Sequence, residues 1–414
     1  MLIACLLFTC FEALRGYHAA AITHLDNGVS LLLELQSHPT KQLQQGGGAN
    51  QTMYPVIPYT PLPLLRALLT RLDTQATQLL PTRRTRLRPV STPCTEYNFT
   101  SLEEAKRVGD ELWNYCLYNL QPSSSSVPTN SSSCPPSSSS SISPTSPASS
   151  SCPSSTSPAS SSCPSSSYSP TQARQHEHQH QHPPQPTARS DIVRLQAQYS
   201  AALHVFLDTH PATTARERQA GMVLRLHDAV ATLSLRPAST SPSEEEWDAY
   251  TPAFTTILSL SRAIMEAEES IAAAPADGGC DDVRRVRGRV GLDTGVLGPL
   301  YLVALRCRDP VVRGEAVRLL GREERREGLW DSNLLARVAE RVVGIEGCGG
   351  EGEGEGERDE VGRRRGSGRR VEDVDLVFDP EEGCKADVRF LMECGGCGSG
   401  GGSGIVSRQE GVRG

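Results

Sequence analysis

Four histidines stand at alternate positions in the stretch QHEHQHQH, namely His176, His178, His180 and His182. Imidazole nitrogens bind zinc, copper and nickel. The stretch lies in Ser-, Pro- and Gln-rich sequence, which supplies no packed groups to orient the rings around a metal ion. We therefore favour a low-complexity expansion over a metal site.

Cys394 and Cys397 form the one CxxC pair among the 13 cysteines of the chain. A tetrahedral zinc site needs about four ligands, and no second pair stands close to this one. Cys134, Cys152 and Cys163 lie in Ser/Pro repeats, and the spacing of the whole set does not match a disulfide framework. We predict free thiols, which fit a reducing compartment, and no metal-binding residues.

Catalytic chemistry has no recognisable signature in this sequence. His18, His24, His204 and His227 fall on predicted helices, but none belongs to a motif that pairs a nucleophile with an orienting group. Walker, GxSxG, HExxH and dinucleotide-binding patterns are absent from the sequence. We predict no catalytic and no cofactor-binding residues, and a function that is not enzymatic.

Three arginine-rich runs are candidates for nuclear import or phosphate contact: 83–88 (RRTRLR), 284–289 (RRVRGR) and 363–370 (RRRGSGRR). None contains an aromatic residue on which a base could stack. The chain carries a formal net charge of −7, whereas nucleic-acid-binding domains are usually basic. We treat the runs as solvated loop charge and predict no direct sequence-specific DNA binding.

Amphipathic helices are the elements that would position these side chains. Apolar residues recur at the three- and four-residue spacing of a buried helix face. This pattern predicts two antiparallel helices within 1–36, and helices over about 64–80, 100–120, 191–206, 214–230, 252–274, 297–308, 310–320 and 332–345.

Capping residues mark the ends of several of these helices. Gly16 is placed to end the first one in the left-handed conformation. Ser101 with Glu104, and Thr214 with Glu217, have the spacing of a capping box. Two further starts are marked by Asp309 before Pro310, and by Asp331 or Ser332.

The N-terminal stretch MLIACLLFTCFEALRG is apolar, but Glu12 and Arg15 interrupt it and no basic region precedes it. A membrane helix needs about 20 apolar residues, and a signal peptide has a different layout. We predict a buried helix here and no membrane association.

Composition divides the chain into helical blocks and low-complexity segments. The fold we predict is all-α, an array of antiparallel helix pairs with a small C-terminal β-hairpin and a long disordered insert. The segments are 1–121 (helical), 122–189 (disordered Ser/Pro/His-rich insert), 190–346 (helical), 347–370 (Gly/Glu/Arg linker), 371–394 (short β-like segment) and 395–414 (disordered tail).

Five segments, in order, resemble the C-terminal regulatory domain of fungal binuclear zinc-cluster transcription factors. The most specific combines PLYLVALRCRDP, from Pro299, with REGLWDS, from Arg326. The others are CLLFTCFEALRG from Cys5, SLEEAKRVGDELWNY from Ser101, RERQAGMVLRLHDAV from Arg216 and VEDVDLVFD from Val371. The resemblance implies stacked helix pairs, which agrees with hairpins that cannot bury their faces alone.

The resemblance implies a nuclear protein that regulates transcription through protein partners, either the transcription machinery or a related regulator, or through a small effector. A second copy of the chain is a further partner compatible with it. Family members begin with six cysteines that hold two zinc ions, spaced CxxC with a third cysteine seven positions on. That pattern is not found in the sequence, so no cofactor is expected in this chain, and zinc belongs only to a missing N-terminal cluster.

We therefore expect a regulatory domain separated from its DNA-binding half, by truncation or by loss. Helices missing before residue 1 would leave the apolar faces of 1–36 partly uncovered, which favours association. The alternative is a helical protein-interaction adaptor that works without DNA; an enzyme ranks third.

Overall fold

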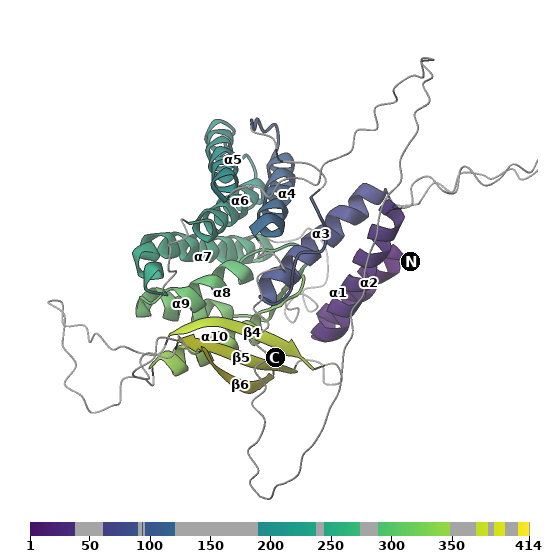
Figure 1. The fold of residues 1–414 in the computed structure, drawn as a ribbon. Helices are drawn as coiled ribbons and strands as arrows, with labels where there is room; N and C mark the ends of the chain where they lie inside the picture. Colours follow the sequence, from purple (N-terminus) through teal and green to yellow (C-terminus); the bar gives the residue numbers. More distant parts are fainter. Residues whose placement is uncertain are drawn as a thin grey trace, which may run out of the picture. The chain divides into compact units, whose positions relative to one another are not determined.

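The computed structural model describes residues 1–37, 61–89, 93, 96–120, 189–236, 244–273, 289–347, 370–379, 385–393 and 405–413. Within these residues it contains ten α-helices and two small three-stranded sheets (Figure 1). The predicted mainly helical fold is confirmed. The helices before Gln121 and after Thr187 belong to one compact unit. The predicted insert, apart from Arg189, lies outside the described residues, as do the histidine run and the CxxC pair.

Helices α1 (Leu2–Arg15) and α2 (His18–Ser37) form the predicted hairpin. Gly16 has φ 79°, and its N–H donates to the carbonyl oxygen of Ala13, as expected of a left-handed cap. Helix α3 (Leu62–Leu79) packs against both. A β-carbon on Gly28 would lie 3.1 Å from atoms of Cys5 and Leu69, so the small residue permits this close crossing.

A second apolar cluster joins α4 (Leu102–Leu120), α5 (Arg189–Thr209) and α6 (Ala215–Ser234). The predicted stripe of α5 is buried in it: Leu195, Tyr199, Leu203 and Phe206. The capping box at Thr214 and Glu217 is confirmed. At α4 the Ser101 hydroxyl accepts the Glu104 N–H at 3.1 Å, while the Glu104 carboxylate turns to the N–H of Thr100.

The remaining helices surround the larger apolar cluster, which also takes in α1 to α3. They are α7 (Thr251–Ala273), α8 (Leu297–Arg306), α9 (Pro310–Leu320) and α10 (Ser332–Gly347), with a 3₁₀ helix η2 (Glu244–Tyr250) before α7. The Asp309 carboxylate accepts the N–H groups of Val311 and Val312 at the start of α9. Of the two candidates for the cap of α10, Asp331 accepts the N–H groups of that helix's first turn.

The first sheet is formed by very short strands, β1 (Arg289–Gly291), β2 (Arg325–Glu327) and β3 (Trp330–Asp331). β1 pairs with β2 in parallel, and β2 with β3 antiparallel. The sequence did not predict this sheet, because strands of two or three residues are too short to show alternation.

The second sheet contains β4 (Val371–Phe378), β5 (Lys385–Glu393) and β6 (Ile405–Arg413), all antiparallel. The predicted hairpin of β4 and β5 is confirmed, and Val371, Val374 and Leu376 join the larger apolar cluster. The prediction of a disordered tail over 395–414 is wrong for 405–413, because β6 pairs along the whole of β5. Ladder hydrogen bonds use only backbone groups, so an apolar stripe is not needed to form such an edge strand.

An apolar stripe on α1 is exposed, so the prediction of a buried helix holds only for the opposite face of α1. Ile3, Leu7, Phe8, Phe11 and Leu14 are each more than two-fifths exposed, and Leu7 is 65% exposed. The opposite face of the helix is buried at Leu6, Thr9 and Ala13. No described helix combines the length and apolar character needed to cross a membrane.

Candidate functional site

A serine, a histidine and an aspartate meet where α5 packs on α6, a grouping that the sequence analysis missed. Asp228 is 6% exposed. Its carboxylate oxygen Oδ2 accepts a hydrogen bond from the Ser200 hydroxyl at 2.8 Å and lies 3.3 Å from Nε2 of His204. The serine therefore donates to the carboxylate rather than to the imidazole, which leaves it without the base that a nucleophile needs. The cluster satisfies a buried carboxylate and is not built as a catalytic triad.

His227, His24 and His18, the other histidines that were predicted on helices, contact neighbouring elements of the fold. The His227 Nε2 lies 3.1 Å from the carbonyl oxygen of Gly295, which joins α6 to the start of α8. His24 stacks on Phe8 with ring centroids 5.2 Å apart. His18 is 5% exposed, packs against Phe378, and its Nδ1 has no hydrogen-bond partner among the described residues.

The first arginine run is only partly the solvated loop charge that was predicted: Arg84, Arg86 and Arg88 are exposed, whereas Arg83 is largely buried and paired. Asp73 is fully buried on α3 and accepts hydrogen bonds from Arg83 and from the backbone N–H groups of Arg86 and Leu87. Arg83 also pairs with Asp26 on α2 at 2.7 Å. These arginines fasten the segment after α3 onto the α1–α2 hairpin. Most of the runs at 284–289 and 363–370 lies outside the described residues.

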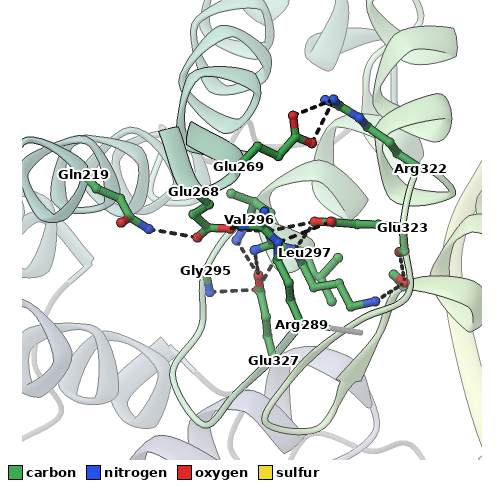
Figure 2. A network of polar contacts seen from close by, with 12 residues as sticks. Gln219, Glu268, Glu269, Arg289, Gly295, Val296, Leu297, Arg322, Glu323 and Glu327 are labelled. Carbon is green, nitrogen blue, oxygen red and sulfur yellow. Dashed lines mark hydrogen bonds and ion pairs between the residues drawn. The ribbon is translucent and has the colours of Figure 1, made fainter. Parts of the chain in front are cut away.

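The REGLWDS segment places a carboxylate beneath the N-terminus of α8. Glu327 is 4% exposed, and its oxygens accept the N–H groups of Gly295 (2.8 Å), Val296 (3.0 Å) and Leu297 (3.0 Å), as Figure 2 shows. A helix start leaves such N–H groups without partners and carries a partial positive charge, both of which a carboxylate satisfies. A β-carbon on Gly295 would lie 2.5 Å from the Glu327 oxygen, so this approach requires glycine.

Glu327 belongs to a larger set of buried and partly buried charges, which we call the Glu327 network: Glu327, Arg325, Glu268, Glu323 and Arg289. Figure 2 labels Glu327, Glu268, Glu323 and Arg289. Arg325 pairs with all three glutamates. Burial alone would lower the pKa of its guanidinium, but the hydrogen bond that it donates to Glu268 and the charge of Glu327 outweigh burial and raise that pKa. The network thus holds β1, β2 and the end of α7 around a permanently charged arginine.

The turn between β2 and β3 is fastened to α3 by a buried amide. Gln75 is 1% exposed; its Nε2 donates to the Leu292 carbonyl at 3.0 Å and its Oε1 accepts the Leu329 N–H at 3.1 Å. Gly328, in this turn, has φ 59°. The segments on either side of 122–186 are therefore joined by specific hydrogen bonds.

The RCRDP segment has a similar role at the other end of α8. Arg308 and Arg313 both pair with Glu346 near the end of α10, and the same carboxylate accepts the N–H of Val371 at the start of β4. Arg313 also donates to the Ala304 carbonyl oxygen at 2.8 Å. Arg308, Arg313 and Glu346 thus fasten α8, α9, α10 and β4 to one another.

A cleft with a volume of about 690 Å³ opens beside the Glu327 network. We call it the α6 cleft, because five of its lining residues lie on that helix. Its charged lining residues are Glu103, Lys106, Arg216, Glu268, Arg289, Asp293, Arg325, Arg326 and Glu327. Its apolar ones are Leu102, Ala220, Val223, Leu224 and Val290. Volumes of about 300–1,000 Å³ are typical of small-molecule sites, and the sequence offered no signal for this one.

Metal binding finds no support in the described part of the chain. No group of three or more His, Cys, Asp or Glu residues is arranged there to hold an ion. The histidine run and the CxxC pair lie outside it, so the predictions made for them remain predictions.

One curated protein with significant similarity is the aspercryptin biosynthesis cluster-specific transcription regulator atnN of Emericella nidulans. The two are 43% identical over 65 residues, which is 14% of this chain and 11% of that protein. No protein-family profile and no solved structure matches the chain. The chain is therefore similar, over a short stretch, to a fungal transcription regulator, and this similarity supports a regulatory role.

Proposed function

We propose that the chain is the regulatory domain of a fungal transcription factor of the binuclear zinc-cluster type and acts in the nucleus. The observation that carries this proposal is the 43% identity over 65 residues to a fungal cluster-specific regulator. In this proposal the domain contacts proteins of the transcription machinery or a related regulator and does not read DNA itself.

The architecture supports the proposal in a second way. Asp309, Glu327 and Asp331, which belong to the segments that carry the resemblance, cap α9, α8 and α10. A sequence pattern that specifies three helix starts is expected to accompany a particular fold. The segments that carry the resemblance therefore have a structural role in the helical array.

A reporter assay tests the proposal. The full chain is fused to a heterologous DNA-binding domain and expressed with a reporter gene that carries the matching operator. We expect a nuclear fusion protein that raises or lowers reporter expression relative to the DNA-binding domain alone. Asp331→Ala, which removes the cap of α10, should abolish the effect. A stable, folded fusion that leaves expression unchanged would refute a regulatory role on DNA.

The second candidate is a DNA-free adaptor, and the exposed α1 stripe favours it. Exposed apolar patches of this kind mark protein-interaction sites. An adaptor would be inert in the fusion assay but would alter the output of a co-expressed full-length relative. Leu7→Glu should remove that effect, whereas Val205→Glu, at a 63% exposed position on α5, should not.

A further inference from the structure

The α6 cleft has a floor whose polar groups are already satisfied. Both oxygens of Glu327 accept backbone N–H groups, and Arg325 pairs with three glutamates. Glu268 accepts from Gln219 through one oxygen and from two arginines through the other (Figure 2). A molecule in the cleft would find a fixed, neutralised floor there rather than free partners.

Most of the charges on the walls are also paired. Lys106 pairs with Asp110 at 3.0 Å, Asp293 with Arg71 at 3.0 Å, and Arg326 with Asp331 at 2.9 Å. Among the nine charged lining residues, only Glu103 and Arg216 have no side-chain hydrogen bond or ion pair within the described part of the chain. Both are exposed to solvent, on the first turns of α4 and α6.

Apolar side chains complete the cleft. Val223 and Leu224 lie on α6, and Leu102 begins α4. Val290, on β1, is 58% exposed even though it is β-branched and apolar. An occupant would thus meet apolar contact area together with one unpaired negative and one unpaired positive group.

We propose that the α6 cleft binds a short apolar peptide with free termini, an amphipathic zwitterion. Its carboxylate is recognised by Arg216, its ammonium group by Glu103, and its apolar side chains by Val223, Leu224 and Val290. A simple organic acid would bring a second negative charge close to Glu103. An organic cation would bring a second positive charge close to Arg216. The interpretation of the cleft as the effector site of a regulator rests on the proposed function. The prediction that the cleft binds such a peptide does not depend on that function.

Calorimetric titration of the purified full chain with three probes tests this assignment. The probes are trileucine, N-acetyl-trileucine and trileucine amide, which share side chains and differ in one terminal charge each. We expect trileucine to bind most tightly and each blocked form to bind about tenfold more weakly, because each loses one charged hydrogen bond. Failure of trileucine to bind, or equal binding of all three, overturns the proposal.

Two exposed substitutions assign the charges. Arg216→Ala should weaken trileucine about tenfold and leave the already weakened amide unchanged. Glu103→Gln should weaken trileucine similarly and leave the acetylated form unchanged. Arg218→Ala, at an exposed position on the same turn of α6 but outside the cleft, serves as the control and should change nothing. Loss of affinity that does not depend on the matching terminus would contradict these roles.

A cavity-filling variant locates the probe. Ala220→Trp should abolish binding of all three peptides while circular dichroism remains that of the parent chain. Undiminished binding in this variant would place the peptide elsewhere, for example on the α1 stripe, and would overturn the assignment. Neither DNA nor a reporter enters these measurements, so their failure is distinguishable from failure of the proposed function.

Discussion

Glu327 joins two elements through one buried carboxylate: it lies on β2, where it also pairs with Arg325, and it caps α8. The side chain is 4% exposed. Breaking a buried ion pair by neutralising one partner usually destabilises a protein by about 3–5 kcal/mol, because the other charge stays buried. At residue scale the network is therefore sensitive to single charge changes.

We expect Glu327→Gln to lower the free energy of unfolding by about 3 kcal/mol, somewhat less than a full break, because Glu268 and Glu323 still neutralise Arg325. Urea denaturation measures the loss. Glu111→Gln, which removes an exposed pair with Arg107 on α4, is the matched control and should cost less than about 0.5 kcal/mol. Equal stabilities of the two variants would show that the network is not a structural centre.

His18 makes stability depend on pH. Burial lowers the pKa of its imidazole from 6.5 to about 4. The negative charge of Asp331 raises this pKa, and the positive charge of Arg326 lowers it further. Because the unfolded chain binds the proton more tightly, this contribution is complete above about pH 6.5 and is lost as pH falls towards 4. The drop in pKa corresponds to about 3 kcal/mol.

His18→Leu keeps an apolar side chain against Phe378 and removes the titration. We expect the stability difference between pH 7 and pH 4.5 to shrink by about 2–3 kcal/mol in this variant. Urea midpoints at the two pH values measure it. A stability difference in His18→Leu as large as that of the parent chain would contradict the role given to His18.

At the scale of elements, the β2–β3 turn depends on Gly328. Its φ of 59° suits glycine, and a β-carbon there would lie 1.9 Å from the Gln75 side-chain oxygen. Gly328→Ala should therefore lower the free energy of unfolding by more than about 2 kcal/mol, through backbone strain and displacement of Gln75. Thermal unfolding measures this.

Gly314 provides the matched comparison, because it lies inside α9 and a β-carbon would meet nothing within 4 Å. Gly314→Ala should stabilise the protein by about 0.5–1 kcal/mol, since alanine favours helix. Destabilisation by both substitutions, to a similar extent, would contradict the role given to the turn.

Local signals explain which elements were predictable. Gly16, Thr214 and Asp309 act on neighbours within a few residues, so their caps could be predicted from the sequence. The pairing of Asp73 with Arg83 also lies close in sequence, but burial of that carboxylate is decided by packing on α2. The short-range sequence pattern was therefore sufficient to predict the helices, but it was not sufficient to predict which charged residues pair with one another.

Long-range contacts explain what was missed. Glu268 and Arg325 lie 57 positions apart, Gln75 and Leu329 254 apart. The α6 cleft arises only once α4, α6 and β1 come together, and nothing in any one segment encodes it. The Ser200–Asp228 contact likewise depends on how α5 packs on α6. Sequence periodicity carries no information about such contacts between segments that are far apart in the sequence.

At the scale of the whole molecule, the residues before Gln121 and after Thr187 fold as one unit. The larger apolar cluster draws from both sides, with Leu69 and Leu25 on one and Leu300 and Val338 on the other. Gln75 and Arg71 add polar contacts across the same boundary. Neither side buries its apolar faces alone.

We therefore expect residues 1–121 and 187–414, expressed as separate chains, to be poorly soluble individually and to co-purify as a folded complex when co-expressed. Burial of a shared apolar core supplies the affinity. Size-exclusion chromatography with circular dichroism measures association and helix content. Gln75→Ala should weaken the complex, because it leaves the Leu292 carbonyl and the Leu329 N–H without partners, whereas Val205→Ala should not. If each fragment alone were monomeric with its own cooperative unfolding transition, the two sides would be independent domains and the unity of the fold would be disproved.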